Sequence, residues 1–160
     1  MLLFETAFLC ALFFVICYLN TGTDERNIKS YNSYPDEIQN IIKNNAEFSN
    51  KIRNISTSAA FISNLITFTI VLFIFGFFIR VNNFRTNFFN ILFMGEMLNA
   101  FDLFVIDLLW WRNSDRTKFS FAKDKPELYK NPKKHISSFI RGAVVFLLVA
   151  AIDGLLLTLL

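Results

Sequence analysis

Residues 88–111 read FFNILFMGEMLNAFDLFVIDLLWW, a stretch long enough and apolar enough to cross a bilayer as one helix. It nevertheless carries four polar side chains, Glu96, Asn99, Asp102 and Asp107. A carboxylate near the middle of a membrane costs roughly 2.5 kcal/mol or more on insertion scales. The stretch therefore predicts a transmembrane helix whose polar residues are turned away from lipid.

The spacing of these four residues places them on one side of an α-helix. At about 100° per residue, Glu96 and Asp107 lie about 20° apart, and Asn99 and Asp102 widen the polar surface to about 140°. Lipid cannot solvate a surface of this kind, so we expect it to face the interior of a helix bundle or a wet cavity.

Three further apolar blocks, residues 2–19, 59–79 and 136–160, are also long enough to span a membrane. The chain is 54% hydrophobic and 18% charged, whereas a soluble domain has about 45–50% apolar and about 25% charged residues. The predicted fold class is all-α: an integral membrane four-helix bundle that forms a single transmembrane domain over residues 1–160.

The basic residues gather in two polar connections, residues 20–57 and 112–135. These connections hold 13 of the 16 Lys and Arg residues, and the second has eight basic residues against three acidic ones. The positive-inside rule then places both connections in the cytoplasm and both termini outside. Because the frequent Asn, Ile, Lys and Phe residues suit an AT-rich bacterial genome, we expect a multi-pass protein of a bacterial plasma membrane.

The first connection contains a candidate amphipathic helix. Ser33 and Asp36 fit a capping box, and isoleucines follow at mostly helical spacing as far as Ile55. This cytoplasmic helix would lie between the first two spans, where it covers the inner mouth of the bundle, contacts a partner or lies on the membrane surface. A solvated extension of the second span is the alternative.

Acidic side chains near the outer ends of three spans suggest an ion site. Glu5, Glu96 and Asp153 all fall in the outer third of the membrane, and Asn99 and Asp102 would continue the polar track inward. If the helices face one another, these residues form a carboxylate-lined proton or cation site. The alternative is that each acid is hydrogen-bonded locally or reaches the interface, and the polar groups only fix helix pairing.

Nearer the cytoplasmic side, Asp107 and Arg141 are expected at similar depth on spans that are joined by one connection. We predict that they form a structural ion pair, because a lone buried charge would be costly.

The start of the last span combines positive charge with a helix N-terminus. Asn131 and Pro132 predict an N-cap and first position, and cations follow in the first turn. Free N–H groups and positive charge together suit an anion, whereas ordinary positive-inside charge is the alternative. The candidates for holding an anionic lipid headgroup are Arg112, Arg116, Lys133, Lys134 and His135.

No established catalytic or metal-binding motif is visible. The two cysteines, Cys10 and Cys17, have no metal-ligand spacing, and His135 is the single histidine. We therefore expect no metal, no cofactor and no nucleic acid partner, and the sequence leaves open whether the protein is an enzyme. The expected partners are the lipid bilayer and a membrane subunit or a second copy of the chain.

Residues 99–110, NAFDLFVIDLLW, precede a basic connection that ends at Lys134 and His135. This region resembles a group of small four-span proteins of Firmicute-type bacteria that have no assigned activity, some of them loosely labelled transporter permeases. The resemblance implies that the N-x-x-D-x-x-x-x-D pattern matters. We therefore expect a non-enzymatic membrane component with a proton or cation site, or a transporter-associated subunit. The alternative is a membrane enzyme that acts on a lipid headgroup at the cytoplasmic face.

Overall fold

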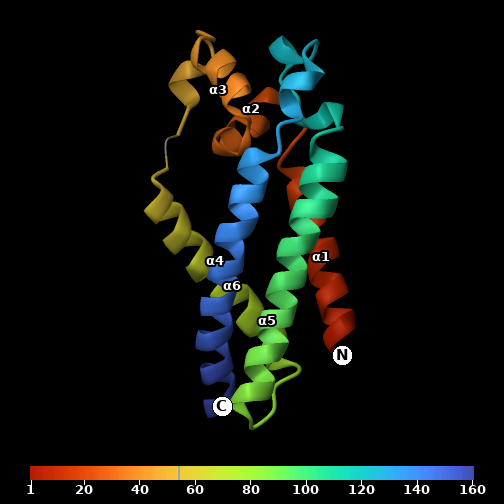
Figure 1. Ribbon diagram of the computed structural model, residues 1–160, viewed down its shortest axis with the longest axis vertical. Coiled ribbons are helices and arrows are strands. Elements are labelled where there is room, and N and C mark those ends of the chain that lie inside the picture. Colours follow the sequence, from red (N-terminus) through yellow and green to blue (C-terminus); the bar gives the residue numbers. More distant parts are fainter. Residues whose placement is uncertain (54) are drawn as a thin grey trace. The chain divides into compact units, whose positions relative to one another are not determined.

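The computed structural model describes residues 1–53 and 55–160, and all regular structure in this part of the chain is helical. The all-α prediction is therefore confirmed. The described residues form six α-helices, which are labelled in Figure 1: α1 (Leu2–Leu19), α2 (Asp24–Asn27), α3 (Asp36–Lys43), α4 (Thr57–Phe77), α5 (Phe84–Phe101) and α6 (Lys133–Leu159).

The chain divides into two compact units. The first, here called the helical unit, comprises Met1–Ala11, Ile55–Phe101 and Phe139–Leu160. The second, the connection unit, comprises Leu12–Asn54 and Asp102–Ser138. Apart from residues 55–57, both predicted connections therefore belong to one unit, and two of its boundaries fall inside the long helices α1 and α6.

Three helical segments are long and apolar enough to cross a membrane: Leu2–Leu19, Thr57–Phe77 and Pro126–Leu159. These findings indicate a membrane protein. The predicted third span, residues 88–111, is not among them, and the structure divides it between α5 and the π-helical segment Asp102–Trp111. The structure therefore supports three apolar helices that can cross a membrane, and the fourth span stays a prediction.

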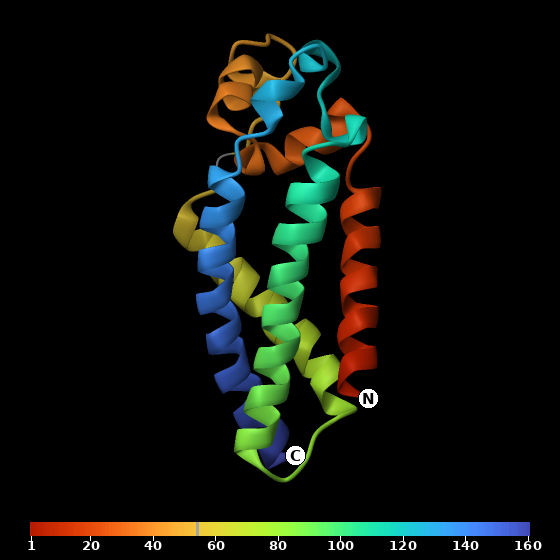
Figure 2. The ribbon, with the colours of Figure 1, turned by 45° about the vertical axis from the view of Figure 1, so that its right-hand side comes forward.

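In the helical unit, α4 and α5 run antiparallel and pack together across the short turn at residues 78–83, as expected for so short a connection (Figure 1). Small residues allow close contacts with α6. A Cβ atom added to Gly154 would lie 3.0 Å from the Cα atom of Phe88, so the backbones approach closely here. In Figure 2, α5 and the C-terminal half of α6 lie side by side.

The residues after α5 do not keep the α-helical repeat. Asp102–Trp111, called η3, is a ten-residue π-helix, and its last turn closes with a hydrogen bond from the Arg112 N–H to the Asp107 carbonyl. Because π-helices bond i to i+5, Asp102 and Asp107 lie on successive turns. The predicted angles of the polar surface, which assumed 100° per residue, do not hold beyond Phe101.

The connection unit has its own aromatic core. Tyr34, fully buried, packs against Trp111 with ring centroids 4.7 Å apart and against Phe119 at 5.0 Å. The isoleucines Ile38 and Ile42 of α3 are also fully buried in this cluster. Residues from both connections therefore make one hydrophobic core.

The predicted amphipathic helix is shorter than its pattern suggested. Helix α3 has eight residues, and Pro35 occupies the N-cap position without a side-chain hydrogen bond, so Ser33 does not form the expected capping box. Ile38 and Ile42 are buried against protein, so this face of α3 is not available to a membrane surface.

Candidate functional site

Asp153 on α6 is the most deeply buried acid of the helical unit. It has 0% exposure, and neither carboxyl oxygen has a hydrogen-bond partner among the described residues. Ala150 and Leu157, one turn away on either side, are buried at 0% and 1% exposure. The carboxyl group therefore lies on the packed face of α6, as its place in the predicted ion site requires.

Glu5 on α1 is a second buried acid. It is 7% exposed, and its Oε2 atom also has no partner in the described part of the chain. Its neighbour Thr6 bonds back to the Leu2 carbonyl at 2.8 Å. Both acids, Glu5 and Asp153, are thus sequestered rather than exposed.

Asn99 joins α5 to α6. Its side-chain Nδ2 donates to the Phe139 carbonyl at 3.1 Å and to Glu96 Oε2 at 3.4 Å. Asn99 also packs against Gly142, where any added Cβ would meet the amide. The amide therefore behaves as an interhelical contact of the kind that polar side chains make in membrane helices.

The structure does not show that the predicted site residues Glu5, Glu96 and Asp153 come together. Among residues 1–53 and 55–160, no three His, Cys, Asp or Glu side chains gather closely enough to hold a metal ion. Glu96 is half-buried and accepts from Asn99. The common site of Glu5, Glu96 and Asp153 stays a prediction.

In the connection unit, Asp107 contacts a residue that the sequence prediction did not assign to it. His135 Nδ1 lies 2.8 Å from Asp107 Oδ2, and the imidazole is only 4% exposed. The Trp111 ring packs edge-on against His135 with centroids 5.1 Å apart. His135 Nε2 is buried and has no partner within the described residues. The predicted pair of Asp107 with Arg141 joins residues of different units and stays a prediction.

Asp102 begins η3 and is half-buried. It lies one π-helical turn before Asp107, and the two carboxyl groups interact electrostatically. The structure thus brings Asp107 into contact with His135, a pairing that the sequence pattern did not indicate.

The five candidates for an anionic headgroup do not share one role. Lys134 forms an ion pair with Asp36 at 2.8 Å, and this hydrogen bond and charge lower the pKa of the Asp36 carboxyl. Arg116 donates to the Tyr18 carbonyl at 3.2 Å and stacks over the Tyr18 ring at 4.0 Å.

The remaining candidates are less tightly placed. Lys133 is exposed and begins α6, one residue later than predicted, and its backbone N–H donates to the Asn131 side chain at 3.1 Å. Arg112 is half-buried, and its Nε has no partner in the described residues. Some of these basic residues therefore contact other parts of the protein, whereas others contribute charge to its surface.

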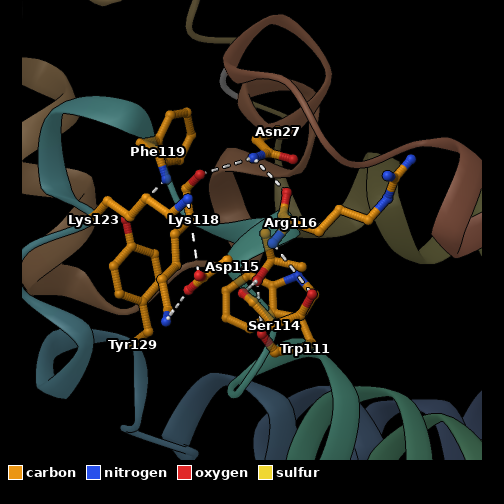
Figure 3. A network of polar contacts seen from close by, with 10 residues as sticks. Asn27, Trp111, Ser114, Asp115, Arg116, Lys118, Phe119, Lys123 and Tyr129 are labelled. Carbon is orange, nitrogen blue, oxygen red and sulfur yellow. Dashed lines mark hydrogen bonds and ion pairs between the residues drawn. The ribbon is translucent and has the colours of Figure 1, made fainter.

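Polar side chains that sequence reasoning missed tie the two connections together. Asn27, which is 1% exposed, donates to the carbonyls of Arg116 at 3.2 Å and Lys118 at 3.4 Å (Figure 3). Within the second connection, Tyr129 accepts from the Phe119 N–H at 3.1 Å, also drawn in Figure 3. A single Asn at the end of a four-residue helix carries no periodic signal, so no pattern could have singled out Asn27.

An open polar pocket of about 610 Å³ lies on the connection unit. Its acids are held by hydrogen bonds from the opposite connection or by nearby lysines: Asp24 accepts from Ser120, and Asp115 pairs with Lys118 at 2.8 Å. The pKa of Asp115 is lowered by the hydrogen bond from Lys118 and by the charges of Lys118 and Lys123. The charges that line the pocket are thus largely compensated.

A comparison with protein families, with curated proteins and with solved structures found no match. The resemblance to small Firmicute-type membrane proteins stays a prediction.

Proposed function

We propose that the protein is a four-span integral membrane protein whose polar interior handles protons or cations, and that it is not an enzyme. The topology is argued from the connection unit. Residues of both connections share one aromatic core, so the connections lie on the same side of a membrane. If α4 crosses the membrane, the chain must cross back before residue 112. Residues 84–111, which form α5 and η3, are the segment that can do so.

The charge of the connections supports an orientation. Their basic residues would face the cytoplasm of a bacterium, with both termini outside. The acids of α5 and η3 explain why this span is less apolar than its three neighbours, since helices that line a polar interior carry ionisable groups that lipid-facing helices avoid.

Asp153 carries the functional part of the proposal. An ionised carboxyl group buried without a partner is very costly, so a protein keeps such a group neutral or supplies it with a cation. A deeply buried acid on a membrane helix is therefore a candidate for ion handling by default. Glu5 and Glu96 extend the acidic character of the same unit.

The proposal is tested with purified protein in phosphatidylethanolamine–phosphatidylglycerol vesicles under a potassium diffusion potential. We expect entry of protons, Na⁺ or K⁺ above the rate of protein-free vesicles, and a lower rate in the Asp153→Asn variant. A Thr67→Val variant, changed on the exposed part of α4, is the matched control. Ion movement equal to that of empty vesicles for every ion would contradict the proposal.

A second candidate function is an enzyme acting on a lipid headgroup, favoured by the contact of Asp107 with His135. A carboxylate that accepts from Nδ1 orients an imidazole so that Nε2 can take a proton, as in acid–base catalysis. The test is incubation of the purified protein with radiolabelled bacterial lipids. Headgroup conversion that is lost in both Asp107→Asn and His135→Gln would favour the enzyme, and unchanged lipids would exclude it.

The membrane partner is proposed to be a second copy of the chain. Asn64 is exposed on α4, and an amide on a membrane helix is stabilised by an interhelical hydrogen bond. Because an amide is both donor and acceptor, Asn64 can pair with the same residue across a two-fold axis. Loss of a dimer in Asn64→Leu, with the dimer retained in Thr67→Val, would support this partner.

A further inference from the structure

Two arginines, one from each connection, are hydrogen-bonded to the C-terminal end of α1. Arg26 donates from Nη1 to the Leu19 carbonyl at 2.9 Å, and Arg116 donates from Nε to the Tyr18 carbonyl at 3.2 Å. Because a helical turn holds about 3.6 residues, these consecutive carbonyls belong to the same, last turn of α1. The two hydrogen bonds therefore hold both guanidinium groups beside one helical turn.

The Arg116 side chain is held by further contacts. Its Cζ atom lies 4.0 Å from the centroid of the Tyr18 ring, and a Cβ atom added to Gly22 would lie 2.7 Å from the same Cζ. The Asn27 side chain donates to the Arg116 carbonyl at 3.2 Å and accepts from the Gly22 N–H at 3.3 Å. In Figure 3, the Arg116 side chain extends away from the other labelled side chains. The guanidinium group is thus positioned by the protein itself.

The positive charges of the two arginines are not neutralised by the protein. Neither forms an ion pair with an acid within residues 1–53 and 55–160. The acids closest in sequence have other partners, since Glu25 pairs with Lys51 and Asp115 pairs with Lys118. A guanidinium group has five N–H donors in a planar fork, and this fork matches the oxygens of a phosphate group. The pair of arginines therefore suits a phosphate ligand.

The surroundings of the arginines indicate that this phosphate belongs to a lipid. Helix α1 is long and apolar enough to cross a membrane, so its last turn would lie at the level of the headgroups. The Tyr18 ring lies 6.1 Å from the Trp110 ring, and Tyr and Trp are enriched at membrane interfaces. One turn earlier, Val15 and Ile16 are exposed. An acyl chain can contact these apolar side chains while the phosphate of the same lipid lies at the arginines.

We propose that Arg26 and Arg116 bind the phosphate group of an anionic phospholipid at the cytoplasmic end of α1. The proposal rests on the membrane topology that belongs to the proposed function, and it does not depend on ion handling. It also moves the headgroup away from the first turn of α6, where the sequence analysis expected it and where Lys134 is paired with Asp36.

The test uses full-length protein in phosphatidylcholine vesicles that contain brominated phosphatidylglycerol or, at the same fraction, brominated phosphatidylcholine. Bromine atoms on the acyl chains quench the fluorescence of nearby tryptophans, and Trp110 lies beside the Tyr18 ring. We expect stronger quenching by phosphatidylglycerol, and loss of this preference in the double variant Arg26→Gln, Arg116→Gln. Both leaflets carry the lipid, so the result does not depend on the orientation of the protein.

The matched control is the double variant Lys29→Gln, Lys125→Gln, which removes one exposed basic residue from each connection and should keep the preference. Size-exclusion profiles and thermal unfolding in detergent establish that each variant is folded. Equal quenching of the unchanged protein by the two lipids would overturn the proposal without any variant. An equal loss of the preference in the two double variants would overturn it as well.

Two further measurements separate the proposal from its alternatives. If millimolar inorganic phosphate abolishes the preference and chloride of the same ionic strength does not, the site takes free phosphate and the lipid proposal is overturned. Ion flux is measured on the same proteins. Flux without a lipid preference would overturn the lipid site alone, whereas a lipid preference without flux would support the lipid site and overturn ion handling alone.

Discussion

In the connection unit, Asp24, Asp36 and Asp115 each have a polar partner although water reaches them, whereas in the helical unit Asp153 is fully buried and has none among the described residues. Exposed ion pairs contribute little to stability, because water already solvates their charges. A buried carboxyl group without a partner works against stability. The contrast supports the proposal that Asp153 handles an ion rather than stabilising the fold.

The aromatic core of the connection unit should be the most sensitive part of the fold. Replacing the fully buried Phe119 by Ala should lower the free energy of unfolding by about 3–5 kcal/mol, because it removes a large side chain and leaves a cavity. Thermal unfolding in detergent, followed by tryptophan fluorescence near Trp111, measures the effect. Phe104→Ala, at an exposed position of η3, is the control. If Phe104→Ala lowers the free energy of unfolding by the same amount, the account of a distinct aromatic core is contradicted.

Replacing the buried acid Asp153 should change the free energy of unfolding in the opposite direction. In Asp153→Leu, the unpaired carboxyl group is replaced by an apolar side chain, so we expect the free energy of unfolding to stay equal or to rise by about 1–3 kcal/mol. The same unfolding assay applies, with Ile152→Leu at a neighbouring exposed position as the control. A loss as large as that of Phe119→Ala would show that Asp153 has a structural partner.

The smallest expected effect concerns the pH dependence of the connection unit. Lys134 lowers the pKa of Asp36 through a hydrogen bond and its charge. A lowered pKa in the folded state gives stability that is present above the unfolded pKa and is lost as pH falls through the folded pKa. The unfolding temperature should therefore decrease slightly on acidification, and Lys134→Gln should reduce that decrease. Glu127→Gln is the control. If the unfolding temperature of Lys134→Gln depends on pH in the same way as that of Glu127→Gln and of the unchanged protein, the Asp36–Lys134 ion pair is contradicted.

Much of the fold could be predicted from the sequence because long apolar runs and charged connections are local signals. The start of α6 was predicted to within one residue from the adjacent Asn131 and Pro132. The π-helix of η3 could not be predicted, since no residue pattern marks the change from i+4 to i+5 bonding.

The partners of charged side chains were harder to predict than the helices. Depth along a span suggested Arg141 as a partner of Asp107, and that pair stays a prediction, but depth gave no sign of the contact that Asp107 makes with His135. The short α3 shows the same limitation: isoleucine spacing indicated an amphipathic segment, whereas the core that buries it includes Phe119 and Tyr129 of the distant second connection.

The topology can be measured directly with single cysteines in a background lacking Cys10 and Cys17. Lys29, Lys123 and Asn82 are exposed positions in the first connection, the second connection and the α4–α5 turn, and each is changed to Cys in turn. With a membrane-impermeant maleimide on intact cells, we predict labelling of Asn82→Cys alone, and labelling of Lys29→Cys and Lys123→Cys only after the membrane is opened. Equal labelling of Asn82→Cys and Lys123→Cys, or opposite behaviour of the two lysine positions, would contradict the proposal that residues 84–111 cross the membrane beneath a shared connection unit.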